Sequence, residues 1–298
     1  MSYFPKRENV MLAYPAETKR IQNIASNGGT EKAFFHQPKL NGERGRIEWF
    51  NHLPILLSSY GNEFSFLDHI QEEIVLLAAA TQEFQRLDGE IYCHGWPRER
   101  IDSALRRKKN NTNKDTPFLE FHIFDIQDEN ELQYNRLRKL GEIAQVIETL
   151  ELKFLKIVDY GICQEGNWLA HAEDYLDNGY EGIILRDVFG QYVMKRTPAL
   201  LKFKPTEQDE YTIVDVNEAI SKEGLNKGMI GSFLVTSPDE PESVIFNVGA
   251  GKLNHATRIR LWNIKEELKG KTLVVKHELL KTSGQVPIAA VAVVVKGV

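Results

Sequence analysis

The sequence has few cysteines, no long apolar run and no excess of positive charge. Its two cysteines, Cys93 and Cys163, exclude a disulfide-stabilised scaffold and a four-cysteine zinc site. Cys93-His94 is not followed by a second pair at zinc-ligand spacing. The longest apolar run, Val286–Val295, is too short to span a bilayer, and no stretch reads as a secretory signal. We therefore expect a cytoplasmic protein without a membrane partner.

The composition is that of an ordinary globular protein. The 298 residues include 42% hydrophobic and 27% charged side chains, and the formal net charge is −5. This length is sufficient for two domains with cores of their own. Because the net charge is negative, a nucleic-acid partner would have to bind local clusters of lysine and arginine. A GxxxxGK[ST] loop is absent, which disfavours P-loop kinases and ATPases.

The pattern of the chain changes near residue 205. Before this point, strand-like segments alternate with long helical patterns, which predict helices over residues 64–84, 129–150 and 168–178. After it, five short strands and one helix follow within about 90 residues, which is typical of a small barrel of the oligonucleotide-binding (OB) type. The change of pattern predicts a domain boundary at this point.

A lysine followed at once by a tight turn, Lys39-Leu40-Asn41-Gly42-Glu43-Arg44, is the candidate centre of the chemistry. A lysine has an ordinary pKa of about 10.4, so it becomes a nucleophile near neutral pH only where burial or nearby positive charge favours its neutral form. Gly42 permits a turn that brings the backbone close to a phosphate. Arg44 can grip a phosphate or a ribose with its planar guanidinium.

Four further fragments have side chains that suit an anionic nucleotide. Two strands begin with glycine-containing turns and have a glutamate, Glu90 and Glu181. Phe124 lies on an alternating strand, and Leu200 to Lys204 alternates so that Lys202 and Lys204 would share one face. Each fragment alone is compatible with an ordinary surface or core residue. Together they predict a site for a metal-bound nucleotide, because carboxylates bind magnesium, lysines neutralise phosphates and an aromatic ring stacks on a base.

The order of these motifs resembles the covalent nucleotidyltransferases, and most closely the small ATP-dependent DNA ligases of viruses and bacteria. Their KxDGxR motif is similar to Lys39–Arg44, their DGE strand to Asp88–Glu90, and their EGhhhR strand to Glu181–Arg186. An aromatic-Asp pair and an LLKxK strand match Phe124-Asp125 and Leu200–Lys204. The resemblance implies an α+β protein. A nucleotidyltransferase (adenylation) domain of antiparallel sheets with flanking helices would occupy residues 1–205, and an OB-fold β-barrel residues 206–298.

The resemblance also implies a mechanism. Lys39 would attack the α-phosphorus of ATP, release pyrophosphate and become lysyl-AMP. The AMP would pass to the 5′-phosphate at a nick in duplex DNA, and the 3′-hydroxyl would then displace AMP and seal the strand. Lys202 and Lys204 would hold the α-phosphate, and Arg44 would contact the ribose or the nick phosphate.

Five other residues acquire roles in the same way. Phe124 would stack on the adenine, Gln37 would contact the edge of the base, and Arg186 would support the site. Glu90 would contact the ribose or a metal, and Glu181 would help to bind Mg²⁺ or Mn²⁺. We expect a monomer that acts in DNA repair, replication or recombination, in a bacterial cytoplasm or a phage-infected cell.

Three positions differ from the family pattern. Asn41 replaces the usual aspartate, and an amide is a weaker metal partner than a carboxylate. Ser59 lies where many relatives have an arginine that contacts phosphates. In the last barrel segment the family has an arginine that orients pyrophosphate, whereas this sequence has only Lys296. Lysine has no bidentate fork, so we expect the formation of lysyl-AMP to be the step most affected.

A basic run is the candidate DNA-binding segment. Its residues include Arg98, Arg100, Arg106, Arg107, Lys108 and Lys109. The run is compatible with a solvated loop or with phosphate contacts along a duplex, and the second interpretation predicts strong salt dependence of binding. The connection between Gly224 and Gly231 is short, so we expect no large DNA-clasping insertion in the barrel.

Other functions are compatible with parts of the pattern. RNA ligases and messenger-RNA capping enzymes share the lysine chemistry, but the Glu181–Arg186 motif and the barrel favour a DNA ligase. An NAD-dependent ligase is disfavoured, because this length leaves no room for its additional modules. A nick-binding protein that has lost catalysis would explain the three departures. The retention of Lys39 and the charged residues predicted around it argues against that interpretation, since a binder needs no nucleophile.

Overall fold

The computed structural model describes residues 9–16, 21, 33–83, 85–105, 113–164, 166–237, 244–251, 253–278, 286–287 and 289–298. The chain divides into two compact units, with the division between Phe203 and Lys204. We call Pro5–Phe203 the N-terminal unit and Lys204–Val298 the barrel unit.

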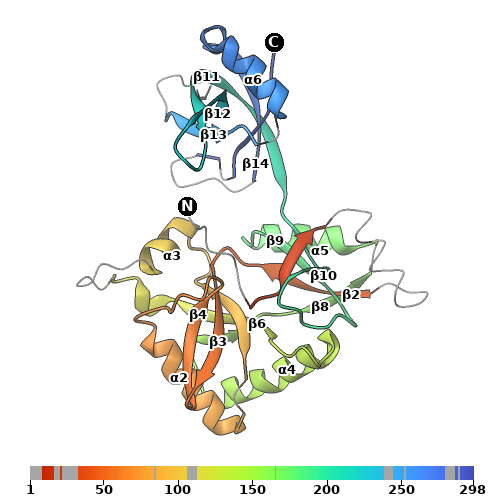
Figure 1. Ribbon diagram of the computed structural model, residues 1–298. Helices are drawn as coiled ribbons and strands as arrows, with labels where there is room; N and C mark the ends of the chain where they lie inside the picture. Colours follow the sequence, from red (N-terminus) through yellow and green to blue (C-terminus); the bar gives the residue numbers. More distant parts are fainter. Residues whose placement is uncertain are drawn as a thin grey trace. The chain divides into compact units, whose positions relative to one another are not determined.

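The first sheet of the N-terminal unit has the strand order β1-β10-β9-β2-β8 (Figure 1). These strands span Leu12–Pro15, Arg196–Phe203, Gly182–Asp187, Ala33–Lys39 and Gly161–Gln164. Helix α5, Trp168–Asp177, packs against β9, β2 and β8. A small core containing Phe34, Leu185 and Leu201 lies between the helix and the sheet.

The second sheet of this unit has the order β4-β3-β5-β6-β7. Its strands span Leu53–Ser58, Glu43–Phe50, Leu87–Tyr92, Glu120–Ile126 and Leu155–Ile157. Helices α2, Asp68–Thr81, and α4, Gln133–Thr149, pack against this sheet and against each other. A short helix, α3, spans Arg98–Leu105, and a 3₁₀ turn, η1, spans Thr116–Phe118. The largest apolar core of the protein lies between this sheet and its helices.

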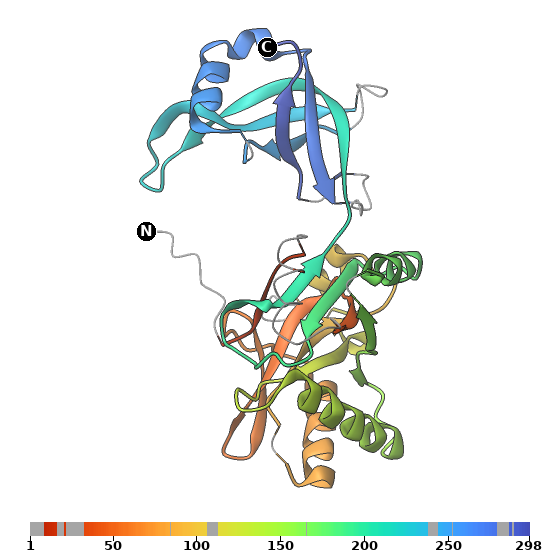
Figure 2. The same cartoon turned by 90° about the vertical axis from the view of Figure 1, so that its right-hand side faces the viewer.

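The barrel unit is a closed barrel of five strands in the order β11-β12-β13-β15-β14. The strands span Thr206–Ile220, Asn226–Thr236, Phe246–Gly249, Val291–Val295 and Thr272–Glu278. Strands β11 and β12 are joined by a hairpin, and helix α6, His255–Asn263, packs against β12 (Figure 2). The Asn254 side chain accepts a bond from Thr257 N at 2.8 Å and so caps α6. A 3₁₀ turn, η2, spans Lys265–Leu268.

The structure confirms the mixed composition of strands and few helices, with some corrections. The helix predicted over residues 64–84 is shorter, and so is the one predicted over residues 129–150. Both sheets are mainly antiparallel, but the pairs β1–β10 and β6–β7 are parallel. The connection between β11 and β12 is a short turn, and both strands are longer than expected because their pairing continues to Ile220 and Asn226 at this turn.

Candidate active site

The lysine turn connects the two sheets of the N-terminal unit. Lys39 is the last residue of β2 in the first sheet, and Glu43 is the first residue of β3 in the second. A side chain at position 42 would not fit, because a Cβ there would lie 2.3 Å from the Ile91 carbonyl oxygen and 2.7 Å from Glu90 Cγ. The glycine therefore lets the turn lie directly against β5, which brings Lys39 beside residues of both sheets.

The Lys39 amine is in an ion pair with Glu181 Oε2, across the junction of β2 and β9. The backbone positions the pair, since Glu181 N donates to Lys39 O at 2.9 Å. The Lys39 side chain is 18% exposed and that of Glu181 is 6% exposed. The structure thus brings together the predicted nucleophile and one of the predicted metal-binding carboxylates. Lys39 must leave this pair before its nitrogen can react.

Glu90 lies on β5 beside the same turn. Its Oε1 accepts a hydrogen bond from Gly42 N at 3.2 Å. Burial raises the pKa of Glu90 to about 7, although the charges of Lys39 and Arg44 oppose this shift. Glu90 is therefore a carboxyl group that titrates near neutral pH next to the candidate nucleophile.

Arg44 forms a bidentate ion pair with Asp88, which is completely buried. Its Nε donates to Asp88 Oδ1 at 2.9 Å, its Nη2 donates to Oδ2, and its Nη1 donates to the Met11 carbonyl at 2.9 Å. Three of the five guanidinium N–H groups are thus used within the protein. Arg44, which the sequence predicts to contact a ribose or phosphate, has two N–H groups that no described residue binds.

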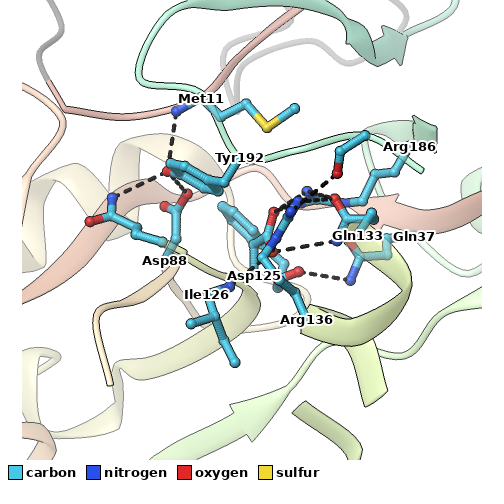
Figure 3. A network of polar contacts seen from close by, with 12 residues as sticks. Met11, Gln37, Asp88, Asp125, Ile126, Gln133, Arg136, Arg186 and Tyr192 are labelled. Atoms are coloured by element: carbon cyan, nitrogen blue, oxygen red, sulfur yellow. Dashed lines mark hydrogen bonds and ion pairs between the residues drawn. The ribbon is translucent and has the colours of Figure 1, made fainter. Parts of the chain in front are cut away.

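A second buried ionic network surrounds Asp125 (Figure 3). We call it the Asp125 network, and its members are Gln37, Asp125, Gln133, Arg136 and Arg186. Arg136 Nε donates to Asp125 Oδ1 at 2.8 Å, and Arg186 Nη1 donates to Oδ2 at 2.7 Å. Burial raises the pKa of Asp125, but the two arginines outweigh burial and hold the pKa below its ordinary value. One buried carboxylate therefore balances two buried guanidinium groups.

The Asp125 network fixes the orientation of Gln37. Arg186 Nε donates to Gln37 Oε1 at 2.6 Å, and Gln37 Nε2 donates to the Phe124 carbonyl at 3.2 Å. Two guanidinium groups lie near the Phe124 ring, with Arg44 Cζ at 5.1 Å and Arg186 Cζ at 5.4 Å from its centroid. Because side chains alternate along β6, Phe124 and the buried Asp125 face opposite sides of the strand.

The two predicted phosphate-binding lysines do not lie on one strand. Lys202 is on β10, paired with Ile184 of β9. The strand ends at Phe203, and Lys204 belongs to the barrel unit, where its Nζ lies 2.6 Å from Glu278 Oε1. The expectation that both lysines belong to one strand is therefore wrong, because Lys204 is the first residue after β10.

The described residues of the basic run have carboxylate partners. Arg98 pairs with Glu43 and with Asp102, and Arg100 donates two bonds to Asp115 while its guanidinium stacks on the Trp96 ring at 3.7 Å. The predicted DNA-binding residues Arg106, Arg107, Lys108 and Lys109 lie outside the described residues.

Two of the positions that depart from the family pattern have surroundings that bear on the expected phosphate contacts. Ser59 is 1% exposed, which leaves little surface for a phosphate contact. Lys296 pairs with Glu210 on the barrel.

Four site residues were not predicted as such from the sequence: Asp88, Gln133, Arg136 and Tyr192. Arg136 had a detectable signal, because it lies on the buried stripe of α4 together with Leu137 and Leu140. A charged residue on an apolar stripe requires a buried partner. Asp88 belongs to the Asp88–Glu90 motif, although no role for it was predicted, and Tyr192 had no signal of either kind.

The donor set at the junction suits a magnesium ion in its chemistry. Glu90 and Glu181 supply carboxylate oxygens, which is the ligand type that magnesium prefers while it retains several waters. Among the described residues, the only group of three possible metal ligands is Glu207, Asp209 and His277, in the barrel unit.

No described helix is long and apolar enough to cross a membrane.

A comparison with protein families identifies a domain that covers most of the N-terminal unit. The model of the ATP dependent DNA ligase domain matches residues 10–204. DNA ligases of African swine fever virus are similar in sequence: those of the isolates Tick/Malawi/Lil 20-1/1983 and Pig/Kenya/KEN-50/1950 are 27% and 28% identical over 251 residues. These matches cover 80% of this chain and 57% of each viral protein, so the chain spans little more than half the length of these relatives.

Solved structures share the fold. The structure named Pmar-Lig_PreS3 superposes with a TM-score of 0.82 at 20% identity, covering 97% of this chain and 68% of that one. A structure from a study of Lig E DNA ligases gives 0.73 at 21% identity, with 97% and 99% covered. The ATP-dependent DNA ligase of bacteriophage T7, in complex with ATP, gives 0.57 at 15% identity, with 97% and 98% covered. At these identities the likeness establishes a common mixed α/β fold.

Proposed function

The chain belongs to the family of ATP-dependent DNA ligase domains, and we propose that it seals nicks between a 5′-phosphate and a 3′-hydroxyl in duplex DNA. The observation that supports this most directly is the ion pair of Lys39 with Glu181 at the junction of the two sheets, beside Glu90. The two carboxylates keep Lys39 as an ammonium in the resting site, and they are also the ligand type that a metal-bound nucleotide requires.

The first step would transfer AMP to Lys39. The Lys39 ammonium leaves Glu181 and loses a proton to water, and its nitrogen forms a bond to the α-phosphorus of ATP. The bond between that phosphorus and the pyrophosphate oxygen breaks, and pyrophosphate leaves. Because Glu181 holds the ammonium in the resting site, we expect ATP binding to separate the pair. Lys202 is the proposed partner of the α-phosphate, whereas Lys204 would first have to leave Glu278.

The two later steps would take place on DNA. The 5′-phosphate at the nick attacks the lysyl-AMP phosphorus and releases Lys39. The 3′-hydroxyl then attacks the activated 5′-phosphorus, and AMP leaves as the strand is sealed. The two remaining N–H groups of Arg44 are suited to the nick phosphate or the ribose, because a guanidinium binds phosphate oxygens in pairs.

Base recognition would use Phe124, Gln37 and Arg186. The Phe124 ring supplies a flat apolar surface for a purine. Gln37 Oε1 already accepts from Arg186, and one N–H of Gln37 Nε2 donates to the Phe124 carbonyl. The second N–H of the amide is the group that we propose for the edge of the base.

Glu90 and Glu181 are the residues that would hold a divalent metal, Mg²⁺ or Mn²⁺. When bound, the metal would neutralise charge on the phosphates. Glu181 can take part only after Lys39 leaves it, and Glu90 only in its ionised form, which predominates above pH 7.

We assign residues 1–205 to an adenylation domain and residues 206–298 to an OB-fold domain. The closed five-stranded barrel with helix α6 supports the second assignment. Barrels of this type bind oligonucleotides on one face, so we propose that both units contact the nicked duplex and that the protein acts as a monomer.

The test is a sealing assay with ATP, magnesium and a duplex that contains one 5′-phosphorylated nick. Radiolabelled ATP reports lysyl-AMP in the same reaction. We expect the wild type to become labelled and to seal the nick, and Lys39→Ala to do neither. Lys39→Arg retains a cation for Glu181 but lacks the amine nucleophile, so it should also be inactive while remaining folded.

A matched control is Lys139→Ala, which removes a lysine that pairs with Glu83 at the surface. We expect its sealing rate to equal that of the wild type. A wild-type protein that binds the nick but never acquires label would contradict the proposal. If the wild type acquires label and seals a nicked RNA–DNA hybrid but not the DNA duplex, the substrate is RNA and not DNA.

A further inference from the structure

Tyr192, between β9 and β10, is completely buried and has a fully used hydroxyl group (Figure 3). The hydroxyl donates to Asp88 Oδ2 at 2.6 Å. It accepts from Met11 N at 3.1 Å and from Gln127 Nε2 at 3.2 Å. A phenol has one O–H donor and two acceptor lone pairs, so all three of its bonding positions are occupied.

These bonds belong to a closed cycle of four residues. Met11 N donates to Tyr192, Tyr192 donates to Asp88, Asp88 pairs with Arg44, and Arg44 Nη1 donates back to the Met11 carbonyl. We call it the Asp88 cycle. A closed cycle constrains each member from two sides, so rotation of the Asp88 carboxylate or of the Arg44 guanidinium breaks at least one other bond.

The cycle determines where the unused part of Arg44 points. Nε, one N–H of Nη2 and one N–H of Nη1 are bound within the cycle. The guanidinium is planar and rigid, so these three bonds fix the direction of its two remaining N–H groups. The Arg44 side chain is 17% exposed, whereas Asp88 and Tyr192 are completely buried, so only Arg44 can present a group of this cycle to a ligand.

We propose that Tyr192 is a positioning residue that acts through Asp88 to orient Arg44 for a phosphate group of the substrate. This inference rests on the proposed ligase function and adds a residue outside the motifs that define the site. The Tyr192 hydroxyl touches no substrate. Without it, the Asp88 carboxylate keeps its charge but gains freedom to rotate, and the Arg44 N–H groups lose their fixed direction.

A double-mutant cycle tests this coupling. The variants are Tyr192→Phe, Arg44→Lys and their combination, and the readout is the single-turnover rate of sealing a nick by enzyme that already holds lysyl-AMP. We expect Tyr192→Phe to slow sealing by about tenfold, the effect of losing one hydrogen bond to a charged group. In the Arg44→Lys background the same change should have less than about a twofold effect, because lysine has no fork to orient.

A purely structural role for Tyr192 would give a different result. Its removal would then lower the unfolding midpoint and would slow sealing by the same factor in both backgrounds. Equal factors in the two backgrounds would overturn the inference.

Tyr175→Phe is the matched control. It also removes a hydroxyl group, which lies 2.8 Å from His36 Nδ1 in the same unit, and no bond connects it to the Asp88 cycle. We expect less than about a twofold change in its sealing rate. A tenfold loss in this control would show that sealing responds to any lost hydroxyl and would likewise overturn the inference.

A milder variant keeps the test decisive if Tyr192→Phe does not fold. Gln127→Met removes one of the two donors to the Tyr192 hydroxyl and also removes Gln127 Oε1, a buried oxygen without a partner among the described residues. We expect Gln127→Met to slow sealing less than Tyr192→Phe does, and we expect this effect to disappear in the Arg44→Lys background. A wild type that neither forms lysyl-AMP nor seals would refute the ligase function itself, whereas an active wild type with equal factors would refute only the role of Tyr192.

Discussion

The two units differ in what they bury. The N-terminal unit buries charged side chains at its site, among them Asp88, Asp125, Arg136 and Arg186. In the described part of the barrel unit, the only buried polar side chains are Thr236 and His277, and the core is aliphatic and aromatic. Buried ion pairs are weak evidence for stability, because desolvation offsets most of their attraction. The barrel is thus held together by apolar packing, whereas the N-terminal unit contains buried charges that packing alone does not require.

The largest effect is expected when a buried charge loses its partner. Asp125→Asn keeps the volume of the side chain but leaves Arg136 and Arg186 without a counter-charge. We expect it to destabilise the N-terminal unit by about 3 to 5 kcal/mol. Hydrogen exchange in urea, resolved by mass spectrometry, measures each unit separately. Asp215→Asn, at a half-exposed pair with Lys269, is the control and should change stability little. A loss below about 1 kcal/mol for Asp125→Asn would mean that the network contributes nothing to folding.

A slightly smaller effect is expected from a cavity in the barrel. Leu273 is completely buried on β14, and Leu273→Ala should destabilise the barrel unit by about 2 to 5 kcal/mol. Because no charge is involved, the loss should be the same at low and high salt. The same hydrogen-exchange experiment at two salt concentrations checks this. A loss that depends on salt would remove the contrast between the two units.

The third prediction concerns the pH dependence of the N-terminal unit. Burial raises the pKa of Glu90 from 4.5 to about 7, so the folded protein binds this proton more tightly than the unfolded chain does. Stability should therefore fall as the pH rises from 4.5 to 7, and Glu90→Gln should remove this part of the dependence. We expect the wild type to lose on the order of 1 to 3 kcal/mol relative to the variant across this range.

Urea unfolding of both proteins at pH 4.5, 6 and 7.5 gives the comparison. All other titrating groups, including His36, are the same in the wild type and in Glu90→Gln, so the difference between the two pH curves reports Glu90 alone. Burial, with a contribution from His171, lowers the pKa of His36 to about 4, which has the opposite effect on stability. Parallel pH curves for the wild type and the variant would contradict the prediction for Glu90.

The smallest effect is expected from an exposed ion pair on the barrel. Lys296 and Glu210 are each about half exposed, so Lys296→Gln should change the stability of the barrel unit by less than about 1 kcal/mol. The rate of lysyl-AMP formation is the second readout, because Lys296 is the only basic residue where relatives have an arginine that orients pyrophosphate. An unchanged rate would show that this lysine does not take over that role.

The sequence predicts the strand-borne parts of the site better than the network that supports them. Lys39, Glu90 and Glu181 lie in short turns and strands, and the strand pattern was sufficient to place them. Arg136 is 11 residues from Asp125 in sequence, and Tyr192 is 104 residues from Asp88. The helical stripe of α4 shows that Arg136 is buried but not which residue it meets, and the contact of Tyr192 with Asp88 depends on how distant segments pack, about which local periodicity carries no information.

The barrel strands could be predicted from the sequence, but the point where the barrel unit begins could not. Its five strands follow from apolar alternation, because each strand has one buried face. The division between the units falls directly after the last residue of β10, within a continuous strand-like pattern, so the sequence placed Lys202 and Lys204 on one strand. The alternation of side chains cannot show where a strand leaves one unit for another.

The strand order of the first sheet has a consequence for how the protein is made. In the order β1-β10-β9-β2-β8, strands from the two ends of the N-terminal unit are neighbours, so a ribosome must synthesise residues through Phe203 before this sheet can be completed. Lys39 and Glu181 are 142 positions apart. At roughly 5 to 20 residues per second, the lysine is synthesised about 7 to 28 seconds before its carboxylate partner. During translation, therefore, the nascent chain carries Lys39 without this partner, and the first sheet can be completed only after Phe203 has been added.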